Sequence, residues 1–522
     1  MTIRQKAARL VMTHISDRSW DDFGDECRRL ERDIEELGVG GFCIFGGNVD
    51  RTPELITAMS ELAGHRLLVA SDLERGLGQQ LEGATVFPSL MMCGATGDPN
   101  LAFAQGCVTA VEARAAGINL VFAPVADVHT EDTNPIIGVR AFGTEPDVVA
   151  EFVTAFVHGL QRGGVAATVK HFPGHGDTRR DSHIELPVVD VDRRTIETRE
   201  FVPFRAAFEE GAKALMTAHV EYPALGDGPA TLCRAITTDM LRHDLGFDGL
   251  VVTDALLMGG IAEHHGPGEA AVLALEAGVD VLLMPADAEA AIQGVVDAVE
   301  EGRLSEERLD TSIARIESLL DWCDACPMPE PPYDVLPREL ADTLRCHLTG
   351  TEEDLWGESR SLVAAEIAKR GVTWLKGDAV ATAAALGSCD PSTVALVAIR
   401  DPKQLGNIVW LRSELESRFP DASLATVTAG ENEVPVDAVA RATCCVLALF
   451  DEVAAWKGHA GPGSDAHDMA ARLLAAVPNA VVLLFAGPHT AGSLESAAGA
   501  VLCCYDGSPP AQIAGVGALF GD

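Results

Sequence analysis

Basic residues are scarce in this chain. Its 522 residues include 39 Lys and Arg against 78 Asp and Glu, which gives a formal net charge of −39. Attraction to nucleic-acid phosphates or to anionic lipid needs a basic face. The composition therefore excludes nucleic-acid binding as a main role and argues against docking on a membrane. It is compatible with a salt-adapted enzyme or with a simply very soluble one.

Long apolar runs and an export signal are also lacking. No apolar run reaches membrane-spanning length, and the N-terminal residues contain no sustained apolar segment before a small-residue cleavage site, so no signal peptide is apparent. The 13 cysteines lie mostly inside apolar runs, where cysteine behaves as a small core residue. We therefore expect a cytoplasmic protein with reduced cysteines.

Signs of a nucleotide cofactor and of internal repetition are missing as well. The glycine-rich stretch at 458–463 lacks the G-x-G-x-x-G spacing between a strand and a helix that binds phosphate. No internal repeat or low-complexity tract is found. We predict that the protein uses no cofactor.

Short apolar runs alternate with amphipathic stretches over roughly the first three fifths of the chain. Several of the amphipathic stretches end in glycine, as helices often do. Strict alternation implies a parallel sheet, and eight such units imply an α/β fold of the (β/α)8 or TIM barrel type, with a doubly wound open sheet as the alternative. The candidate strands are Leu10–Ile15, Gly41–Phe45, Leu67–Ser71, Leu120–Pro124, Ala166–Lys170, Ala214–Ala218, Gly249–Thr253 and Val279–Met284.

A proline-rich segment separates this pattern from a second α/β pattern. Residues 326–340 predict a stiff, extended linker. We therefore predict a catalytic barrel over residues 1–325 and a smaller α/β sandwich domain over residues 341–522. The buried strands expected in the second domain are Val394–Ile399, Cys444–Phe450, Ala480–Phe485 and Ala500–Cys504.

The stretch Val165–Pro187, VAATVKHFPGHGDTRRDSHIELP, predicts a buried strand followed by a polar loop. In Asp181-Ser182-His183, a carboxylate two residues from an imidazole can fix the ring tautomer and leave the other nitrogen to give or take a proton. The alternatives are that Asp181 only caps the next element, or that a Zn²⁺ site forms. Lys170 is a poor neighbour for a cation, so we predict no metal. The candidate metal ligands were His171, His175, Asp177 and His183.

Polar residues also follow the other candidate strands. Asp254 ends a buried strand among apolar neighbours, where a carboxylate is costly without a partner or a function, although a helix N-cap is the alternative. Active sites of TIM barrels lie at the carboxyl ends of the strands, so this recurrence supports the barrel. The other residues at such positions are Asp72, Glu74, Asp127, Arg140 and His219. We expect Glu74, Asp127 and His219, together with Asp177, to play supporting roles.

The motif K-H-F-P-G-H-G-D-T…D-S-H resembles the signature of glycoside hydrolase family 3, in its β-N-acetylglucosaminidase branch. The segment G-F-D-G-L-V-V-T-D-A-L-x-M, which begins at Gly246, resembles the part that carries the nucleophilic aspartate of the family. F-A-P-V-A-D-V and R-A-F-G match the loop after the fourth strand. Two departures are D-L-E-R-G in place of the commoner D-x-E-G-G, and Ala141 where Ser is commoner.

The resemblance implies a retaining exo-β-N-acetylglucosaminidase, with Asp254 as the nucleophile that forms a covalent glycosyl-enzyme. It implies that His183, oriented by Asp181, is the acid/base group. A cytoplasmic member would remove N-acetylglucosamine from cell-wall muropeptides, although no residue reveals that aglycone. The side chains that the resemblance places on the sugar hydroxyls are Asp72, Arg140, Lys170 and His171.

Other activities remain open. Retaining glycosidases usually use two carboxyl groups, whereas a neutral imidazole repels an anion less, so phosphate could replace water as in a β-N-acetylglucosaminide phosphorylase. A β-glucosidase or β-xylosidase would have S-D-W in place of Thr253-Asp254-Ala255 and would lack the D-x-H loop. A non-catalytic carbohydrate-binding relative is disfavoured by the intact Asp254, Asp181 and His183.

Overall fold

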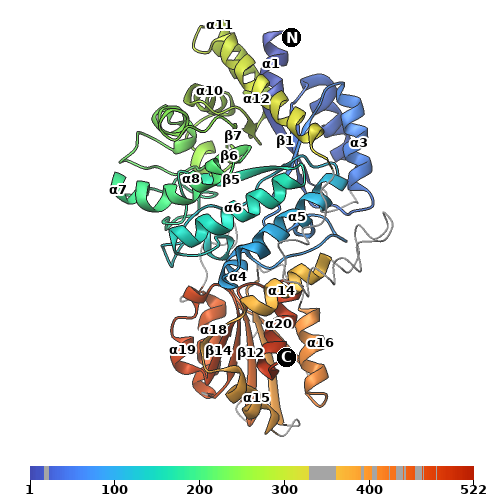
Figure 1. Ribbon diagram of the computed structural model, residues 1–522, viewed down its shortest axis with the longest axis vertical. Helices are drawn as coiled ribbons and strands as arrows, with labels where there is room; N and C mark the ends of the chain where they lie inside the picture. Colours follow the sequence, from blue (N-terminus) through green and yellow to red (C-terminus); the bar gives the residue numbers. More distant parts are fainter. Residues whose placement is uncertain are drawn as a thin grey trace. The chain divides into compact units, whose positions relative to one another are not determined.

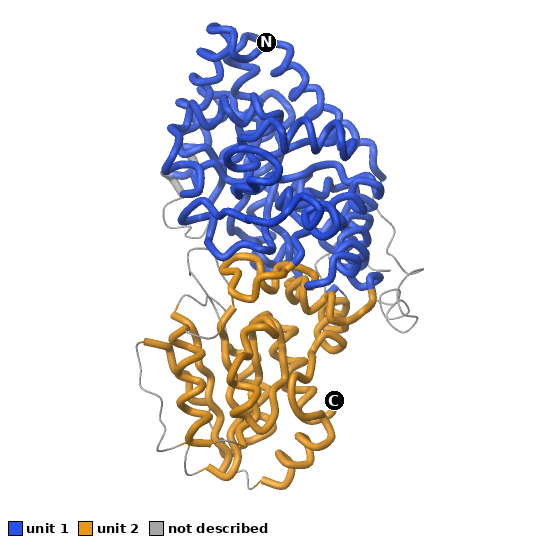
Figure 2. Tube along the Cα trace, turned by 90° about the vertical axis from the view of Figure 1, so that its left-hand side faces the viewer, with its two compact units in different colours: residues 1–85, 99–128, 144–360 blue, residues 86–98, 129–143, 361–522 orange. Residues whose placement is uncertain are grey.

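The computed structural model divides the chain into two compact units (Figure 2), residues 1–85, 99–128 and 144–360, and residues 86–98, 129–143 and 361–522. Two segments from the first half of the chain thus belong to the second unit. Most of the predicted linker lies outside the described residues, so the linker and the predicted domain boundaries stay predictions. The described residues are 1–16, 23–327, 360–389, 393–402, 408–422, 424–430, 439, 442–452, 461, 464–477 and 479–522.

The first unit is built around an eight-stranded parallel sheet with the order β7-β6-β5-β4-β3-β2-β1-β8. A parallel bridge between Val252 and Val281 links the two ends of this row, so the sheet forms a nearly closed barrel. The predicted TIM barrel is confirmed and the open doubly wound sheet is wrong. The strands are β1 (Val11–Ser16), β2 (Gly41–Phe45), β3 (Leu68–Ser71), β4 (Leu120–Val121), β5 (Ala166–Phe172), β6 (Ala214–Thr217), β7 (Leu250–Val252) and β8 (Leu282–Leu283).

Helices surround these strands (Figure 1), which is why the strands are buried and read as continuous apolar runs. No helix among the described residues is long and apolar enough to cross a membrane. The larger α-helices are α1 (Ile3–Arg9), α2 (Phe23–Glu31), α3 (Thr52–Ala63), α5 (Pro99–Ala115), α6 (Pro146–Arg162), α8 (Phe201–Glu209), α10 (Pro267–Ala277), α11 (Ala288–Glu300) and α12 (Glu306–Ala325). Shorter or π-helical segments are η2 (Arg32–Leu37), η5 (Ile196–Glu200), η7 (Ala235–Asp244) and α9 (Gly259–Ala262).

The second unit contains a six-stranded sheet with the order β11-β10-β12-β13-β14-β9, in which β9 runs antiparallel to β14. The four predicted strands are present, and two edge strands, β9 and β11, were missed. Its strands are β9 (Thr373–Lys376), β10 (Val394–Arg400), β11 (Leu424–Thr428), β12 (Cys444–Phe450), β13 (Val481–Phe485) and β14 (Ala500–Cys503). Its helices include α4 (Leu90–Ala95), η4 (Gly138–Arg140), α14 (Ser361–Gly371), α15 (Ala379–Gly387), α16 (Val409–Arg418), α18 (Asp465–Ala476), α19 (Leu494–Ala497) and α20 (Pro509–Phe520).

Successive residues of the central strands of this sheet face opposite layers. Leu396 and Val446 belong to a core that includes residues of α16 and α20, whereas Val397 and Leu447 belong to a core that includes residues of α18. This alternation follows from the two-residue period of a strand. The predicted α/β sandwich is therefore confirmed, with helices on both faces of the sheet.

Candidate active site

Six of the seven predicted site residues lie at or after the carboxyl ends of three barrel strands. Four lie close to the strand ends, and two lie in the loop that follows β5. Asp72 directly follows β3, and Asp254 lies two residues after β7. Lys170 and His171 lie near the end of β5, which continues to Phe172, two residues beyond the predicted end. The loop after β5 contains Asp181 and His183.

The ammonium group of Lys170 joins two carboxylates. Its Nζ lies 2.6 Å from Asp72 Oδ1 and 2.7 Å from Glu74 Oε1. The Lys170 side chain is 2% exposed, whereas that of Asp72 is 28% exposed. A buried charge is costly unless it is paired, so Lys170 fixes Asp72 where the carboxylate can still reach a ligand. Glu74, expected only as a supporting residue, is an integral part of this ion-paired group.

Asp127 orients the two histidines on either side of Pro173. Its Oδ2 lies 2.7 Å from His171 Nδ1, and its Oδ1 accepts the backbone N–H of His175 at 2.7 Å. Asp127 is fully buried, and although burial opposes ionisation, His171 and His175 hold the pKa of its carboxyl below the usual value. Fixing Nδ1 of His171 leaves Nε2 of that ring for a ligand.

The loop after β5 turns back as the Asp-x-His spacing predicts. Asp181 Oδ1 lies 2.8 Å from His183 Nδ1 and accepts the His183 backbone N–H at 2.9 Å. His175 stabilises this turn through both ring nitrogens. Its Nδ1 lies 2.8 Å from Thr178 Oγ1, and its Nε2 lies 2.9 Å from Ser182 Oγ. The Asp181 side chain is 2% exposed, but that of His183 is 24% exposed. The ring is therefore oriented by a buried carboxylate and open to a ligand.

The four side chains of the alternative zinc site make separate contacts. His171 pairs with Asp127, His175 with Thr178 and Ser182, and Asp177 with Arg199 at 2.6 Å. Within the described ranges, no group of three or more His, Cys, Asp or Glu side chains is placed to hold a metal ion.

Two glycines of α9 hold the Asp181–His183 turn close to the segment that follows Asp254. The N–H groups of Gly259 and Gly260 donate to His183 O at 3.1 Å and Ser182 O at 3.2 Å. A Cβ at Gly259 would stand 2.5 Å from Ile184 O, which is too close for backbone that cannot move aside. Glycine at this position thus allows the turn to approach.

Replacing Gly259 with Ala should displace the turn that carries His183. We expect a clear loss of kcat and a stability cost of about 1–3 kcal/mol, because the new methyl group meets backbone rather than a flexible side chain. The matched control is Gly266→Ala, since a Cβ there meets nothing within 4 Å. Steady-state kinetics and urea unfolding of both variants make the comparison; equal kcat values for the two would contradict the role of this contact.

Asp254 stays ionised because nearby histidines and a backbone N–H favour its charged form. Ala255 N–H donates to its Oδ1 at 2.8 Å. Burial by itself would raise the pKa of the carboxyl, but His171, His219 and His183, together with the Ala255 bond, lower it to about 2. Asp254 and His183 therefore act on one another electrostatically, although they are far apart in the sequence.

His219, two residues after the end of β6, contacts the backbone beside Asp254. Its Nδ1 lies 2.8 Å from Thr231 Oγ1 and its Nε2 lies 3.0 Å from Ala255 O. The ring is completely buried, and burial lowers its pKa. It contacts the backbone next to Asp254, and its supporting role stays a prediction.

Arg140 lies in the second unit, in η4, where its Nη1 donates to Ile136 O at 3.0 Å. It is not among the site residues that the barrel strands and their loops contain. Its predicted contact with the sugar alongside Asp72, Lys170 and His171 stays a prediction.

Glu200, which sequence reasoning missed, is a buried carboxyl behind the same loop. It ends the π-helical segment η5, a local irregularity that is frequent at functional sites. Its Oε1 accepts Arg199 Nε at 2.6 Å, while no described residue bonds its Oε2. Burial raises the pKa of Glu200 to about 7, with Asp127 and Asp177 acting in the same direction and Arg199 opposing them. Nothing in the local sequence of η5 signals this burial.

Replacing Glu200 with Gln should remove one pH dependence of stability. The folded-state pKa of about 7 lies above the ordinary value of 4.5, so the folded protein binds the proton more tightly between these values. Stability from this group is present below about pH 4.5 and is lost as the pH rises to about 7, by an amount on the order of 3 kcal/mol. Urea unfolding at pH 5 and pH 8 should show this loss in the parent protein and not in Glu200→Gln; parallel pH profiles would refute it.

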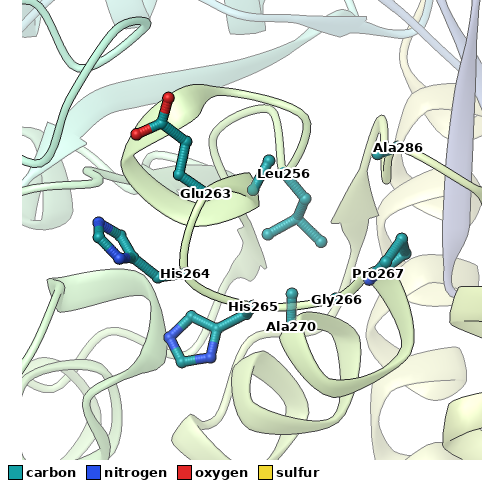
Figure 3. A pocket seen from close by; sticks show the side chains of 9 residues that line it. Leu256, Glu263, His264, His265, Gly266, Pro267, Ala270 and Ala286 are labelled. Atoms are coloured by element: carbon teal, nitrogen blue, oxygen red, sulfur yellow. The ribbon is translucent and has the colours of Figure 1, made fainter.

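A cavity of about 220 Å³ adjoins the loop that follows Asp254. Its polar side chains are Glu263, His264 and His265, and Leu256 and Ala270 contribute apolar surface (Figure 3). None of the predicted site residues lines it. The cavity is therefore a neighbour of the candidate site and not its centre.

Several known proteins are similar to this chain. Residues 2–319 match the model of the glycosyl hydrolase family 3 N-terminal domain. Beta-hexosaminidase A of Pseudoalteromonas piscicida is 34% identical over 385 residues, which are 66% of this chain and 61% of that protein. The beta-hexosaminidase of Nitrosomonas eutropha is 35% identical over 286 residues, which are 52% of this chain and 82% of that protein.

A solved structure extends the similarity to both units. The glycoside hydrolase family 3 beta-N-acetylglucosaminidase from a Paenibacillus species matches with a TM-score of 0.83 at 30% identity, covering 100% of this chain and 97% of that one. The Pseudoalteromonas protein is longer than the aligned region, which spans about three fifths of it.

Proposed function

This chain belongs to glycosyl hydrolase family 3, and from that membership we propose that it removes terminal β-linked N-acetylglucosamine with retention of configuration. The activities named for the Pseudoalteromonas, Nitrosomonas and Paenibacillus proteins support this substrate. The observation that carries the mechanism is the 2.8 Å contact between Asp181 and His183. The loop that contains them is bonded to α9, and His183 lowers the pKa of Asp254.

In the first step, the ionised Asp254 attacks the anomeric carbon. The carboxylate forms a bond to that carbon while the glycosidic bond breaks, and His183 gives the proton from Nε2 to the leaving oxygen. Asp72, Lys170 and His171 hold hydroxyl groups of the sugar, since charged partners make the stronger hydrogen bonds. Asp181 keeps Nδ1 of His183 bonded throughout, which leaves Nε2 for the reaction.

In the second step, His183 acts as a base. It takes a proton from water, whose oxygen attacks the anomeric carbon and releases Asp254 as a carboxylate. The imidazolium that forms is stabilised by the buried Asp181 carboxylate. Configuration is retained because the anomeric carbon is inverted twice.

Phosphorolysis is the second candidate, because the acid/base group is an imidazole rather than a carboxylate. A neutral ring does not repel an incoming phosphate, which would then release a sugar 1-phosphate. The experiment is turnover of aryl β-N-acetylglucosaminide and aryl β-glucoside, each with and without phosphate. We expect cleavage of the first substrate, free N-acetylglucosamine as product and little cleavage of the glucoside. A sugar 1-phosphate would establish the phosphorylase, and preference for the glucoside would overturn the substrate assignment.

We also propose cell-wall muropeptides as the physiological substrates, as the family resemblance implies. The test is the specificity constant for a disaccharide of N-acetylglucosamine and anhydro-muramic acid with its stem peptide, against that for chitobiose. A clear preference for the muropeptide is expected. Equal or better use of chitobiose would refute this aglycone without affecting the assignment of the cleaved sugar.

A further inference from the structure

A cavity of about 730 Å³ lies at the N-terminal ends of β7 and β8. Asp248 and Gly278, which line it, precede these strands, whereas Asp254 follows β7, so the cavity is at the opposite end of the barrel from the candidate active site. Its walls include residues of η7, α10 and α12. Five arginines line it, namely Arg234, Arg242, Arg303, Arg308 and Arg315.

Three of these arginines share a single buried carboxylate. Asp280 lies 2.8 Å from Arg242 Nη2, 3.0 Å from Arg315 Nη1 and 3.5 Å from Arg308 Nη1. Asp280 is fully buried, and it also accepts hydrogen bonds from Ser312 Oγ at 2.8 Å and from Val251 N–H at 3.1 Å. Its acceptor capacity is therefore used, and two of the three guanidinium charges have no carboxylate of their own.

The other acidic groups around the cavity do not restore the balance. Glu269 and Glu276 both pair with Arg303, at 2.9 and 3.2 Å, and Asp248 is exposed at the rim. Five arginines but only two carboxylates, Glu276 and Asp248, line the cavity, and Glu269 and Asp280 pair with the arginines from outside this lining. The net charge of the chain is −39. Burial lowers the pKa of Arg242 to about 10, and Arg315 and Arg308 act in the same direction against Asp280. Positive charge is thus concentrated in this cavity, although acidic residues outnumber basic ones in the chain as a whole.

Two of the arginines keep hydrogen-bond donors for a ligand. Arg315 bonds Asp280 through Nη1 alone, and within the described ranges its Nε and Nη2 have no partner. Arg234, which is exposed, makes no polar contact with a described residue. Guanidinium groups match phosphate oxygens with two parallel hydrogen bonds, and this volume is in the range of cavities that hold small molecules.

We propose that this cavity is a binding site for a small phosphate-bearing anion, held chiefly by Arg315 and Arg234, with Arg308 and Arg242 behind them. The anion supplies the negative charge that Asp280 alone does not. The site is independent of the catalytic residues, because it lies at the other end of the strands. Its ligand is either inorganic phosphate or the phosphate group of a larger metabolite.

The test is isothermal titration of the full chain with inorganic phosphate, glucose 6-phosphate and glucose in a buffer low in other anions. Saturable binding of phosphate is expected, and of glucose 6-phosphate at least as tightly, with none of glucose. Tighter binding of glucose 6-phosphate indicates a metabolite site, and equal binding a site for the free ion. Arg315→Gln and Arg234→Gln should each weaken binding about tenfold or more, the effect of losing a charge-assisted bond.

Arg234→Gln protects the test against loss of folding, because this exposed side chain makes no polar contact with a described residue. Arg66→Gln, an exposed arginine paired with Glu317 and Asp321 away from the cavity, controls for the loss of one positive charge and should bind like the parent. Asp254→Asn should bind phosphate unchanged. The proposal is overturned if millimolar phosphate does not bind, if the two cavity variants bind normally, or if binding depends on the catalytic residues.

Discussion

Replacing Asp254 with Asn should lower kcat on an aryl β-N-acetylglucosaminide by at least about 10³-fold, the scale on which loss of a catalytic group is felt. The amide is nearly the same size and can still occupy the end of β7, but it is a very poor nucleophile towards the anomeric carbon. Because the pKa of Asp254 is lowered to about 2, the parent enzyme should show no loss of activity from protonation of this group until the pH falls below about 3.

The control for this experiment is Asp244→Asn, which removes an exposed carboxylate from the end of η7, the helix that precedes β7. It should leave kcat unchanged. Circular dichroism and urea unfolding should show that both variants are folded. If Asp254→Asn keeps more than a tenth of the parent activity while folded, the nucleophile lies elsewhere and the covalent mechanism assigned to Asp254 is wrong.

Replacing His183 with Ala should have an effect that depends on the leaving group. On chitobiose, whose leaving sugar needs a proton, kcat/KM should fall by about 10²–10⁴-fold. On a dinitrophenyl glycoside the leaving group needs no proton, so the first step should remain fast and the glycosyl-enzyme should accumulate, because no base activates water. Azide, which needs no base, should then restore turnover and give the β-glycosyl azide.

Asp181→Asn should show the same pattern with a smaller loss on chitobiose, because an amide cannot stabilise the imidazolium of His183 as a carboxylate does. The matched control is Glu185→Gln, which removes an exposed carboxylate from the same loop, where Glu185 pairs with Arg180. Equal losses on chitobiose and on the dinitrophenyl glycoside in His183→Ala, or no response to azide, would show that His183 positions the substrate and is not the acid/base group.

Local sequence was sufficient to locate the elements of the barrel. Its strands are buried on both faces, so each appears as a short apolar run between amphipathic helices, and all eight were found. Their predicted ends ran too far in places, as at Leu120–Pro124, where β4 is only Leu120–Val121, because burial continues after ladder pairing ends. β11 was missed because it is an edge strand whose Ala425 and Thr426 are exposed, which weakens the apolar signal.

The sequence by itself determined which residue types could do the chemistry. It placed Asp254 after a buried strand and put Asp181 two residues from His183, a spacing that allows the contact seen in the structure. Tertiary structure alone decided that Lys170 joins Asp72 and Glu74, that three histidines act on Asp254, and that Gly259 lets the His183 turn lie against α9. It also decided the burial of Glu200 and the sharing of Asp280 by three arginines. The physical reason is that desolvation and electrostatic interaction depend on distances between segments far apart in the chain, which no local pattern contains.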